Sequence, residues 1–209
     1  MTRRTNARIA GFTFLFYIAV GILGMILFNP AAGVAGIAAK LAAIAEHATK
    51  VRIGLCLNLL MSFSALVLAV TLYSLTRDED SDLALLGLTC RVGEGVISAI
   101  FMFADLGLLW LAMASGADAP DPAAAQALGA FLFKMGSWSP TIGAIYFAVG
   151  STLFSWLFLR GRMIPVALAW LGVFASILLV VLLPAQLAGF VKGPVTAFMW
   201  LPALVFEVV

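Results

Sequence analysis

Three ionisable side chains interrupt an apolar stretch that is long enough to cross a lipid bilayer. The stretch covers residues 83–113, and it contains Arg91, Glu94 and Asp105. Because an ionised group is costly in hydrocarbon, such residues normally face the interior of a helical bundle, where they serve function or packing. These three residues are therefore the first candidates for a buried polar site.

The spacing of these residues indicates how they are arranged on one helix. Arg91 and Glu94 are three positions apart, which is the spacing of an intrahelical ion pair. Glu94 and Asp105 are about three turns apart, or about 16 Å along the axis, on nearly the same face. In a compact bundle, Glu207 of the last apolar run can approach that face. Asp105 and Arg52 are secondary polar candidates, and both are expected on the outer side of the membrane.

Two interpretations of this cluster stay open. In the first, Arg91, Glu94 and Glu207 border a polar cavity that binds an anionic head group or a small polar molecule, or relays protons. In the second, a buried salt bridge fixes the register of the helices and binds no ligand. Buried salt bridges stabilise proteins poorly, but they can specify an arrangement. Asp105 is expected in a solvated position at the outer mouth of the bundle.

The composition of the chain indicates an integral membrane protein whose first partner is the lipid bilayer. Its 209 residues are 64% hydrophobic and 11% charged, whereas a soluble domain has about 25% charged residues. The net charge of +2 is too small to indicate a nucleic-acid partner. Cys56 and Cys90 both lie in apolar runs, which favours buried thiols over a disulfide.

Enzyme signatures are missing from the sequence. It contains no zinc-protease, nucleophile-elbow, Walker or dinucleotide-binding motif. The single histidine, His47, lies in an expected outer helix, where it cannot act as the base of a buried serine nucleophile. The sequence thus predicts no catalytic residues, no metal site and no cofactor, and an intramembrane enzyme is the least favoured class.

Six apolar runs predict an all-α, polytopic transmembrane bundle that forms a single domain over residues 1–209. The expected spans are residues 9–28, 51–75, 83–113, 140–159, 165–183 and 195–209. The first run is longer than the about 7–15 residues of a signal-peptide core, which favours an uncleaved helix. The last run is shorter than the ~20 residues of a transmembrane helix. Its helix is either tilted or truncated, and we favour truncation.

Two short amphipathic helices are expected between the spans, on the outer side. In residues 31–50, apolar side chains recur at three- and four-residue steps and form one narrow stripe. An alanine-rich packing helix without membrane contact is the alternative for this segment. Asp121 followed by Pro122 is typical of a helix start, and predicts a second short helix over residues 123–133.

Glycine and arginine patterns add two predictions. Gly136, Gly143 and Gly150 recur every seven residues and predict a face where another helix can approach closely.

Arginines before the first apolar run favour a cytoplasmic N-terminus, because the flank of the first helix often decides orientation. The basic residues then expected inside are Arg3, Arg4, Arg8, Arg77, Arg160 and Arg162. Those expected outside are Lys40, Lys50, Arg52, Lys134 and Lys192.

Short motifs along nearly the whole chain resemble one family. They are Arg8-Ile-Ala-Gly11, Arg52, Leu72-Tyr73, Arg91, Arg162-Met-Ile-Pro165, and Pro202 with Glu207. With these motifs the chain resembles the bacterial family called domain of unknown function 4386. The resemblance implies a multi-spanning protein of the bacterial inner membrane without an assigned activity. In that family the last helix continues beyond the glutamate, which is why truncation is favoured here.

The function that the sequence favours is a non-enzymatic binding or transport module for a small or lipid-like ligand. Its site would be the buried cluster of Arg91, Glu94 and Glu207. The alternative is a structural subunit or assembly factor of a membrane complex, in which the charges serve only helix packing. A homo-oligomer or a partner membrane protein is compatible with both.

Overall fold

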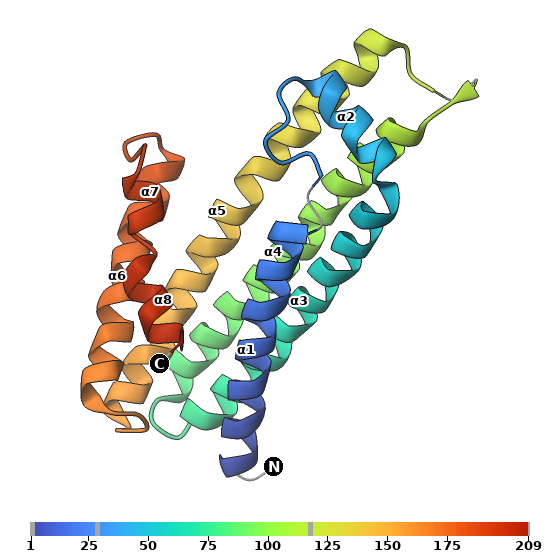
Figure 1. The fold of residues 1–209 in the computed structure, drawn as a ribbon. Helices are drawn as coiled ribbons and strands as arrows, with labels where there is room; N and C mark the ends of the chain where they lie inside the picture. Colours follow the sequence, from blue (N-terminus) through green and yellow to red (C-terminus); the bar gives the residue numbers. More distant parts are fainter. Residues whose placement is uncertain (1–2, 28–29, 117–118, 209) are drawn as a thin grey trace.

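The protein is built from helices joined by short connections. The computed structural model describes residues 3–27, 30–116 and 119–208, and no β-strand occurs in these ranges. The helices are α1 (Arg3–Leu27), α2 (Ile37–Glu46), α3 (Ala48–Thr76), α4 (Ser81–Met113), α5 (Pro122–Arg160), α6 (Val166–Leu187), α7 (Val195–Phe198) and α8 (Leu201–Val208). The predicted all-α fold class is confirmed (Figure 1).

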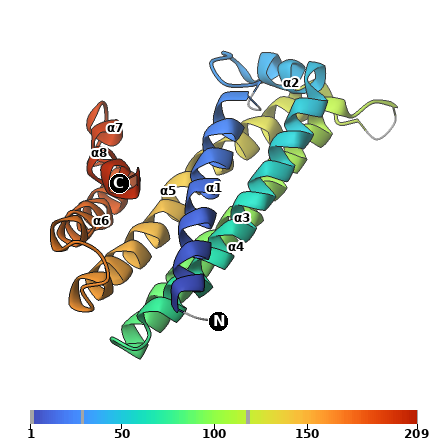
Figure 2. The same ribbon diagram turned by 60° about the horizontal axis from the view of Figure 1, so that its bottom comes forward.

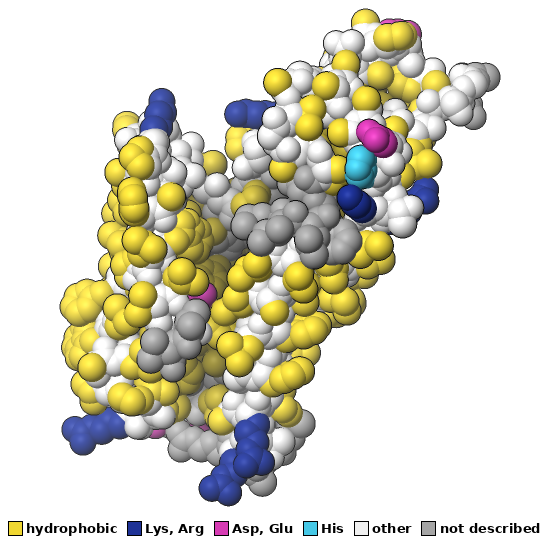
Figure 3. Space-filling view, viewed as in Figure 1, with side chains coloured by type: hydrophobic (Ala, Val, Ile, Leu, Met, Phe, Trp, Pro, Cys, Tyr) yellow, Lys and Arg dark blue, Asp and Glu magenta, His cyan; other side chains and the backbone are white. Residues whose placement is uncertain are grey.

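Within the described part of the chain, five helices are long and apolar enough to cross a membrane: α1, α3, α4, α5 and α6. Large apolar side chains cover their outward faces, and the side chains of Phe12 and Phe103 are each 73% exposed. Figure 3 shows this apolar surface along the sides of the helices, with basic side chains gathered at the ends. So much exposed apolar surface is unfavourable in water, and the chain is a membrane protein.

The first three spans lie close to their expected positions. α1 begins before residue 9, and Phe28, where this span was expected to end, lies outside the described residues. α3 and α4 each extend slightly beyond residues 51–75 and 83–113. α4 starts after Asp80, whose side chain accepts a hydrogen bond from a backbone N–H of the first turn. This is the usual way in which an aspartate caps a helix.

The prediction of a separate short helix over residues 123–133 is wrong. These residues and the expected span 140–159 belong to one continuous helix, α5. Its start is as predicted, because Asp121 accepts hydrogen bonds from two backbone N–H groups of the first turn at 2.9 and 3.0 Å. Pro140 was expected to begin a new helix, but it lies inside α5. Transmembrane helices tolerate an internal proline when neighbouring groups satisfy the freed backbone carbonyl.

The last two apolar runs also differ from expectation. α6 continues through Pro184 to Leu187, although this span was expected to end at residue 183. Residues 195–209 do not form one helix, because α7 and α8 are separated by a two-residue turn. Pro202 accounts for the break, since it has no N–H to donate to the carbonyl of Phe198, four residues earlier, and fits the first turn of a helix. Val209 lies outside the described residues.

α2 packs across one end of the bundle. It covers residues 37–46 of the expected 31–50, and the side chains of Leu41 and Ile44 on its apolar stripe are buried. The stripe faces α4 and α5. At Gly129 of α5, a Cβ atom would lie 3.0 Å from the Ile37 side chain. The helix and its stripe were thus predicted, but its expected ends were wrong, because residues 31–36 precede the helix and residues 48–50 belong to α3. Its contact with the membrane stays a prediction.

The helices form two groups that are joined through α5. α1 packs on α3, α3 on α4, α4 on α5, and α5 on α6. The C-terminal group of α6, α7 and α8 is held to α5 by a buried apolar cluster of Ala148, Ala175, Leu179, Leu183, Met199 and Ala203. Figures 1 and 2 show this group set apart from α1, with α5 between them. A groove therefore remains between α1 and α8, and the surface is hollowed there (Figure 3).

Candidate functional site

Arg91 and Glu94 form a buried ion pair within α4. Nη1 of Arg91 lies 2.8 Å from Oε2 of Glu94, and the two residues are 1% and 4% exposed. The spacing of three residues explains the contact, because side chains at i and i+3 share one helix surface. Moving both charges out of water is costly, so the pair needs further favourable contacts to be maintained.

Groups from two neighbouring helices provide such contacts. Tyr17 of α1 donates a hydrogen bond from Oη to Oε1 of Glu94 at 2.9 Å. Cζ of Arg91 lies 4.7 Å from the centroid of the Phe147 ring of α5, a distance at which a cation is attracted to the ring face. A Cβ atom at Gly150 would lie 3.1 Å from Cγ and Cδ of Arg91. The missing side chain at this glycine thus makes room for the arginine stem.

The predicted glycine face allows close approach of a neighbouring helix along only part of its length. A Cβ atom at Gly143 would lie 3.8 Å from Oγ of Ser98 on α4, which is ordinary contact distance. At Gly136, nothing would lie within 4 Å of a Cβ atom. Of these three glycines, only Gly150 therefore lies in tight contact with α4, at the level of Arg91.

The Arg91 guanidinium retains hydrogen-bonding capacity. Its Nε and Nη2 atoms are buried and have no hydrogen-bond acceptor among the residues that the structure describes. These two nitrogens lie on one edge of the guanidinium, and such an edge can donate two parallel hydrogen bonds to a carboxylate or a phosphate. A buried donor without an acceptor is unfavourable. This edge is therefore a place where an oxyanion would be bound favourably.

Two cavities border the ion pair. The larger one has a volume of about 450 Å³ and is lined by Glu94, Asp105 and Glu207. The smaller one has a volume of about 200 Å³, with Arg91 and Glu207 set in a largely apolar wall. Both cavities are lined by residues of α1 and α8 as well as of the central helices. They form the inner part of the groove between α1 and α8 (Figure 3).

Glu207 lines both cavities, and it shares one with Arg91 and the other with Glu94. Its side chain is half-buried, and it makes no ion pair or hydrogen bond with a described residue. The structure thus brings together the three residues that the sequence analysis grouped. We call Arg91, Glu94 and Glu207 the polar cluster.

The two secondary candidates differ in their relation to the polar cluster. Asp105 is half-buried and lines both the larger cavity and a further one, of about 370 Å³, that Ile44 of α2 borders. Nη2 of Arg52 lies 3.6 Å from Sδ of Met113, at the C-terminal end of α4. Arg52 lines a different cavity from the polar cluster. The structure therefore links Asp105 to the candidate site through the larger cavity and separates Arg52 from it.

Two residues that contact the ion pair were not selected from the sequence. Tyr17 carries a polar group inside an apolar helix, and this was the signal that could have identified it. Phe147 is one of 16 phenylalanines, and its contact depends on how α5 packs on α4. In the described ranges, no group of three or more His, Cys, Asp or Glu residues could hold a metal ion. Cys56 and Cys90 are free thiols, but Cys56 is exposed and Cys90 is half-buried, so the prediction that both are buried is wrong.

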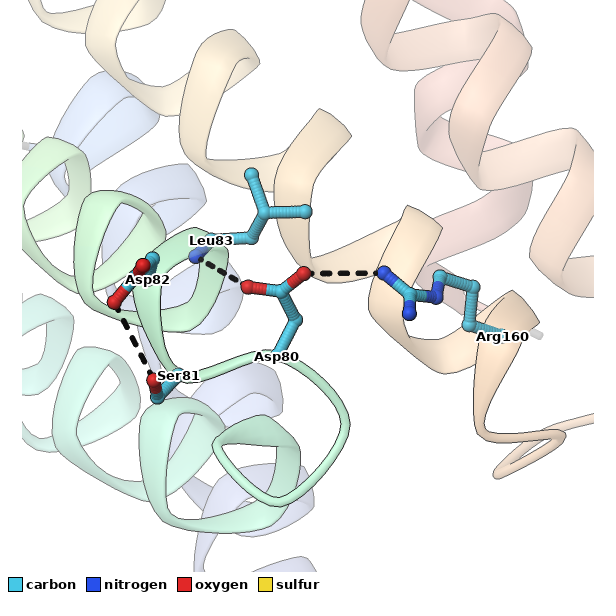
Figure 4. Close-up of polar contacts among 5 residues, drawn as sticks. All are labelled: Asp80, Ser81, Asp82, Leu83 and Arg160. Carbon is cyan, nitrogen blue, oxygen red and sulfur yellow. Dashed lines mark hydrogen bonds and ion pairs between the residues drawn. The ribbon is translucent and has the colours of Figure 1, made fainter.

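A second polar contact joins α4 and α5 at the end of the bundle (Figure 4). Oδ2 of Asp80 lies 3.1 Å from Nη1 of Arg160, while Oδ1 accepts the hydrogen bond from the backbone N–H of Leu83 at 3.1 Å. The Leu83 hydrogen bond and the Arg160 guanidinium lower the pKa of Asp80 below its ordinary value, since both favour the ionised form. This contact fixes the start of α4 against the end of α5.

The comparison with protein families gives a match over residues 9–209, nearly the whole chain, to the family described as domain of unknown function (DUF4386). The chain belongs to this family. The match includes Arg91 and the segment with Pro202 and Glu207, on which the resemblance in part rested. No match was found among curated proteins or among solved structures. Membership of DUF4386 assigns no activity, so function has to be argued from the site.

Proposed function

We propose that this DUF4386 protein is a non-enzymatic binding or transport module for a small or lipid-like ligand. The ligand occupies the groove between α1 and α8 and contacts the polar cluster. The observations that support this proposal are the buried Nε/Nη2 edge of Arg91, which has no acceptor among the described residues, and the cavity that Arg91 lines. If the charges served packing alone, the packed interior would be expected to supply acceptors for these donors.

The surroundings of the polar cluster favour a lipid-like ligand. Apolar side chains such as Phe14, Leu72 and Phe154 form most of the wall of the smaller cavity, next to Arg91. Since α1 has its main contacts with α3, no extensive helix contact closes the groove on the α8 side. An amphiphile can therefore enter sideways from the bilayer, with its head at the polar cluster.

For location, we propose the bacterial inner membrane with the N-terminus in the cytoplasm and residues 1–209 as one domain. Arg8 lies in α1 near its start, and Arg77 directly follows α3. Arg160 ends α5 and contacts Asp80, which brings the turn after α3 beside the turn after α5. An excess of arginine at this end is what the positive-inside rule expects of a cytoplasmic face.

A second candidate is a structural subunit or assembly factor of a membrane complex, with a homo-oligomer or another membrane protein as the partner. The observation in its favour is that the ion pair joins three helices. Tyr17 ties α1 to Glu94, and Phe147 ties α5 to Arg91. In this account the polar cluster only specifies how the helices are arranged.

The substitution Glu94→Gln distinguishes the two candidates. Glutamine keeps a carbonyl acceptor for Tyr17 and nearly the same volume, but removes the charge that holds Arg91. Thermal stability in detergent and the amount of copurifying lipid are measured on the same preparations, with Asp78→Asn as an exposed control on the loop after α3. A binding site predicts that the copurified ligand decreases in Glu94→Gln. Lower stability with an unchanged amount of lipid would overturn the proposal.

A further inference from the structure

We infer that the ligand is a zwitterionic amphiphile whose polar head carries both an oxyanion and an ammonium group. The oxyanion binds the Nε/Nη2 edge of Arg91, the ammonium binds Glu207, and the apolar chain lies in the groove between α1 and α8. This inference rests on the proposed function and names the chemical class of the ligand.

The oxyanion follows from the geometry at Arg91. The ion pair with Glu94 is made by Nη1, at 2.8 Å, while Nε and Nη2 on the opposite edge have no hydrogen-bond acceptor among the described residues. Two parallel N–H donors match the two oxygens of a carboxylate or a phosphate. The Phe147 ring at 4.7 Å restricts the guanidinium plane. Arg91 is therefore oriented to hold Glu94 on one side and a ligand oxyanion on the other.

The charges that surround the cavities favour an ammonium group in the ligand. Three carboxylates, those of Glu94, Asp105 and Glu207, line the larger cavity, and no Lys, Arg or His is among its described lining residues. Arg91 offsets one of these charges through its ion pair. An anion alone would add to the remaining negative charge, whereas a head group with both signs leaves the total unchanged. Of the two carboxylates that make no ion pair with a described residue, Glu207 is the one that shares the smaller cavity with Arg91.

The apolar walls of the smaller cavity favour an apolar chain in the ligand. In the smaller cavity, side chains of Phe14, Leu68 and Phe206 stand beside the two charged groups. Burial of apolar surface is favourable at about 25 cal/mol per Å², so a hydrocarbon chain adds affinity that a free head group lacks. The same contacts would bind a phosphate or a carboxylate head group. A soluble zwitterion without an apolar chain supplies the same charged groups, and the experiment distinguishes it from a lipid.

The test is a thermal-shift titration of the full chain, purified in detergent and depleted of lipid. Four probes separate the parts of the ligand. Dioleoylphosphatidylethanolamine has the oxyanion, the ammonium and the chains, and dioleoylphosphatidylglycerol lacks the ammonium. Dodecylamine lacks the oxyanion, and phosphoethanolamine lacks the chains. Because a ligand that binds only the folded state raises the melting temperature, the four apparent affinities can be compared directly.

The wild type is expected to bind phosphatidylethanolamine about tenfold more tightly than phosphatidylglycerol. Phosphatidylglycerol lacks the ammonium and therefore loses one hydrogen-bonded contact with a charged group. In Glu207→Gln this preference should vanish while phosphatidylglycerol binding is retained. Asp82→Asn, an exposed control, should leave both affinities unchanged. Arg91→Lys should weaken both phospholipids, and Glu207→Gln keeps the test valid if the Arg91 variant does not fold.

Three results would overturn the inference. Equal binding of the two phospholipids to the wild type, lost in Arg91→Lys, would show an oxyanion ligand without an ammonium, and the proposed function would survive. Phosphoethanolamine binding as tightly as its lipid form would show a soluble ligand. Saturable binding of none of the four probes would exclude the zwitterionic class, while a ligand that copurifies and depends on Glu94 would still support the proposed function.

Discussion

Oη of Tyr17 in α1 donates a 2.9 Å hydrogen bond to Oε1 of Glu94 in α4, across 77 positions of sequence. The bond joins a helix that borders the groove to the helix that carries the buried ion pair. It also leaves Oε2 of Glu94 for Arg91, at 2.8 Å. One carboxylate therefore determines both how α1 is positioned and how the guanidinium is turned.

Tyr17→Phe removes this donor without changing the shape of the ring. We expect the free energy of unfolding to fall by roughly 1–3 kcal/mol, because a buried carboxylate oxygen loses its hydrogen bond. The measurement is thermal or denaturant unfolding in detergent. Tyr146→Phe is the matched control, since the Tyr146 side chain is 42% exposed. Equal effects of the two substitutions would show that the Tyr17 bond does not stabilise the fold.

Gly150→Ala places a methyl group against the arginine stem, 3.1 Å from Cγ and Cδ of Arg91. Overpacking of this kind costs about 1–3 kcal/mol, and we expect lower stability and displacement of the guanidinium. Gly136→Ala on the same helix provides the control, because nothing lies within 4 Å of a Cβ atom there. Both alanines favour the helix by about 0.5–1 kcal/mol. The difference between the two melting temperatures therefore reports the contact with Arg91, and no difference would argue against it.

Arg91→Met and Glu94→Leu should each destabilise the protein by roughly 3–5 kcal/mol, because each leaves one buried charge without its partner. The double variant should lose less than the sum of the two single variants, since no unpaired charge of the ion pair remains. Denaturant unfolding of all four proteins in mixed micelles gives the coupling free energy. Strictly additive losses would mean that the 2.8 Å contact contributes nothing to the fold.

The contact between Asp80 and Arg160 predicts a dependence of stability on pH. The pKa of Asp80 is lowered in the folded state by the Leu83 backbone hydrogen bond and by Arg160. The stabilisation is therefore complete above the ordinary aspartate pKa of about 3.9 and is lost as the pH falls through the lowered value. Asp80→Asn should reduce the melting temperature at neutral pH and have less effect in acid. Asp78→Asn, on the same loop, is the control, and an acid profile unchanged by Asp80→Asn would contradict this assignment.

Much of the fold could be predicted because its signals are local. The long apolar runs predict α1, α3 and α4, and the Asp121–Pro122 pair predicts the start of α5. The break before Pro140 and the end at Pro184 were predicted wrongly for one reason. A proline disrupts an isolated helix, but α5 and α6 both continue through theirs. Transmembrane helices tolerate a proline where groups from elsewhere in the fold satisfy the freed carbonyl, and the local sequence does not show such groups.

The candidate site, like the fold, could be predicted only in part. The Arg91–Glu94 contact lies within one helix, so a spacing of three residues was sufficient to predict it. The free edge of Arg91 and the two cavities depend on how α8 packs against α6. At Gly172 of α6, a Cβ atom would lie 2.6 Å from the Phe206 ring. This packing sets the position of Glu207, and no periodicity in the sequence indicates it.

We propose that the groove between α1 and α8 holds one ligand at the polar cluster. Native mass spectrometry of the purified protein tests it most directly, because it reports bound molecules, oligomeric state and partner subunits together. We expect one retained ligand per wild-type chain and none on the double variant Arg91→Met with Glu94→Leu, at equal folded fractions. A wild type without ligand, or the same retained ligand on both proteins, would contradict it.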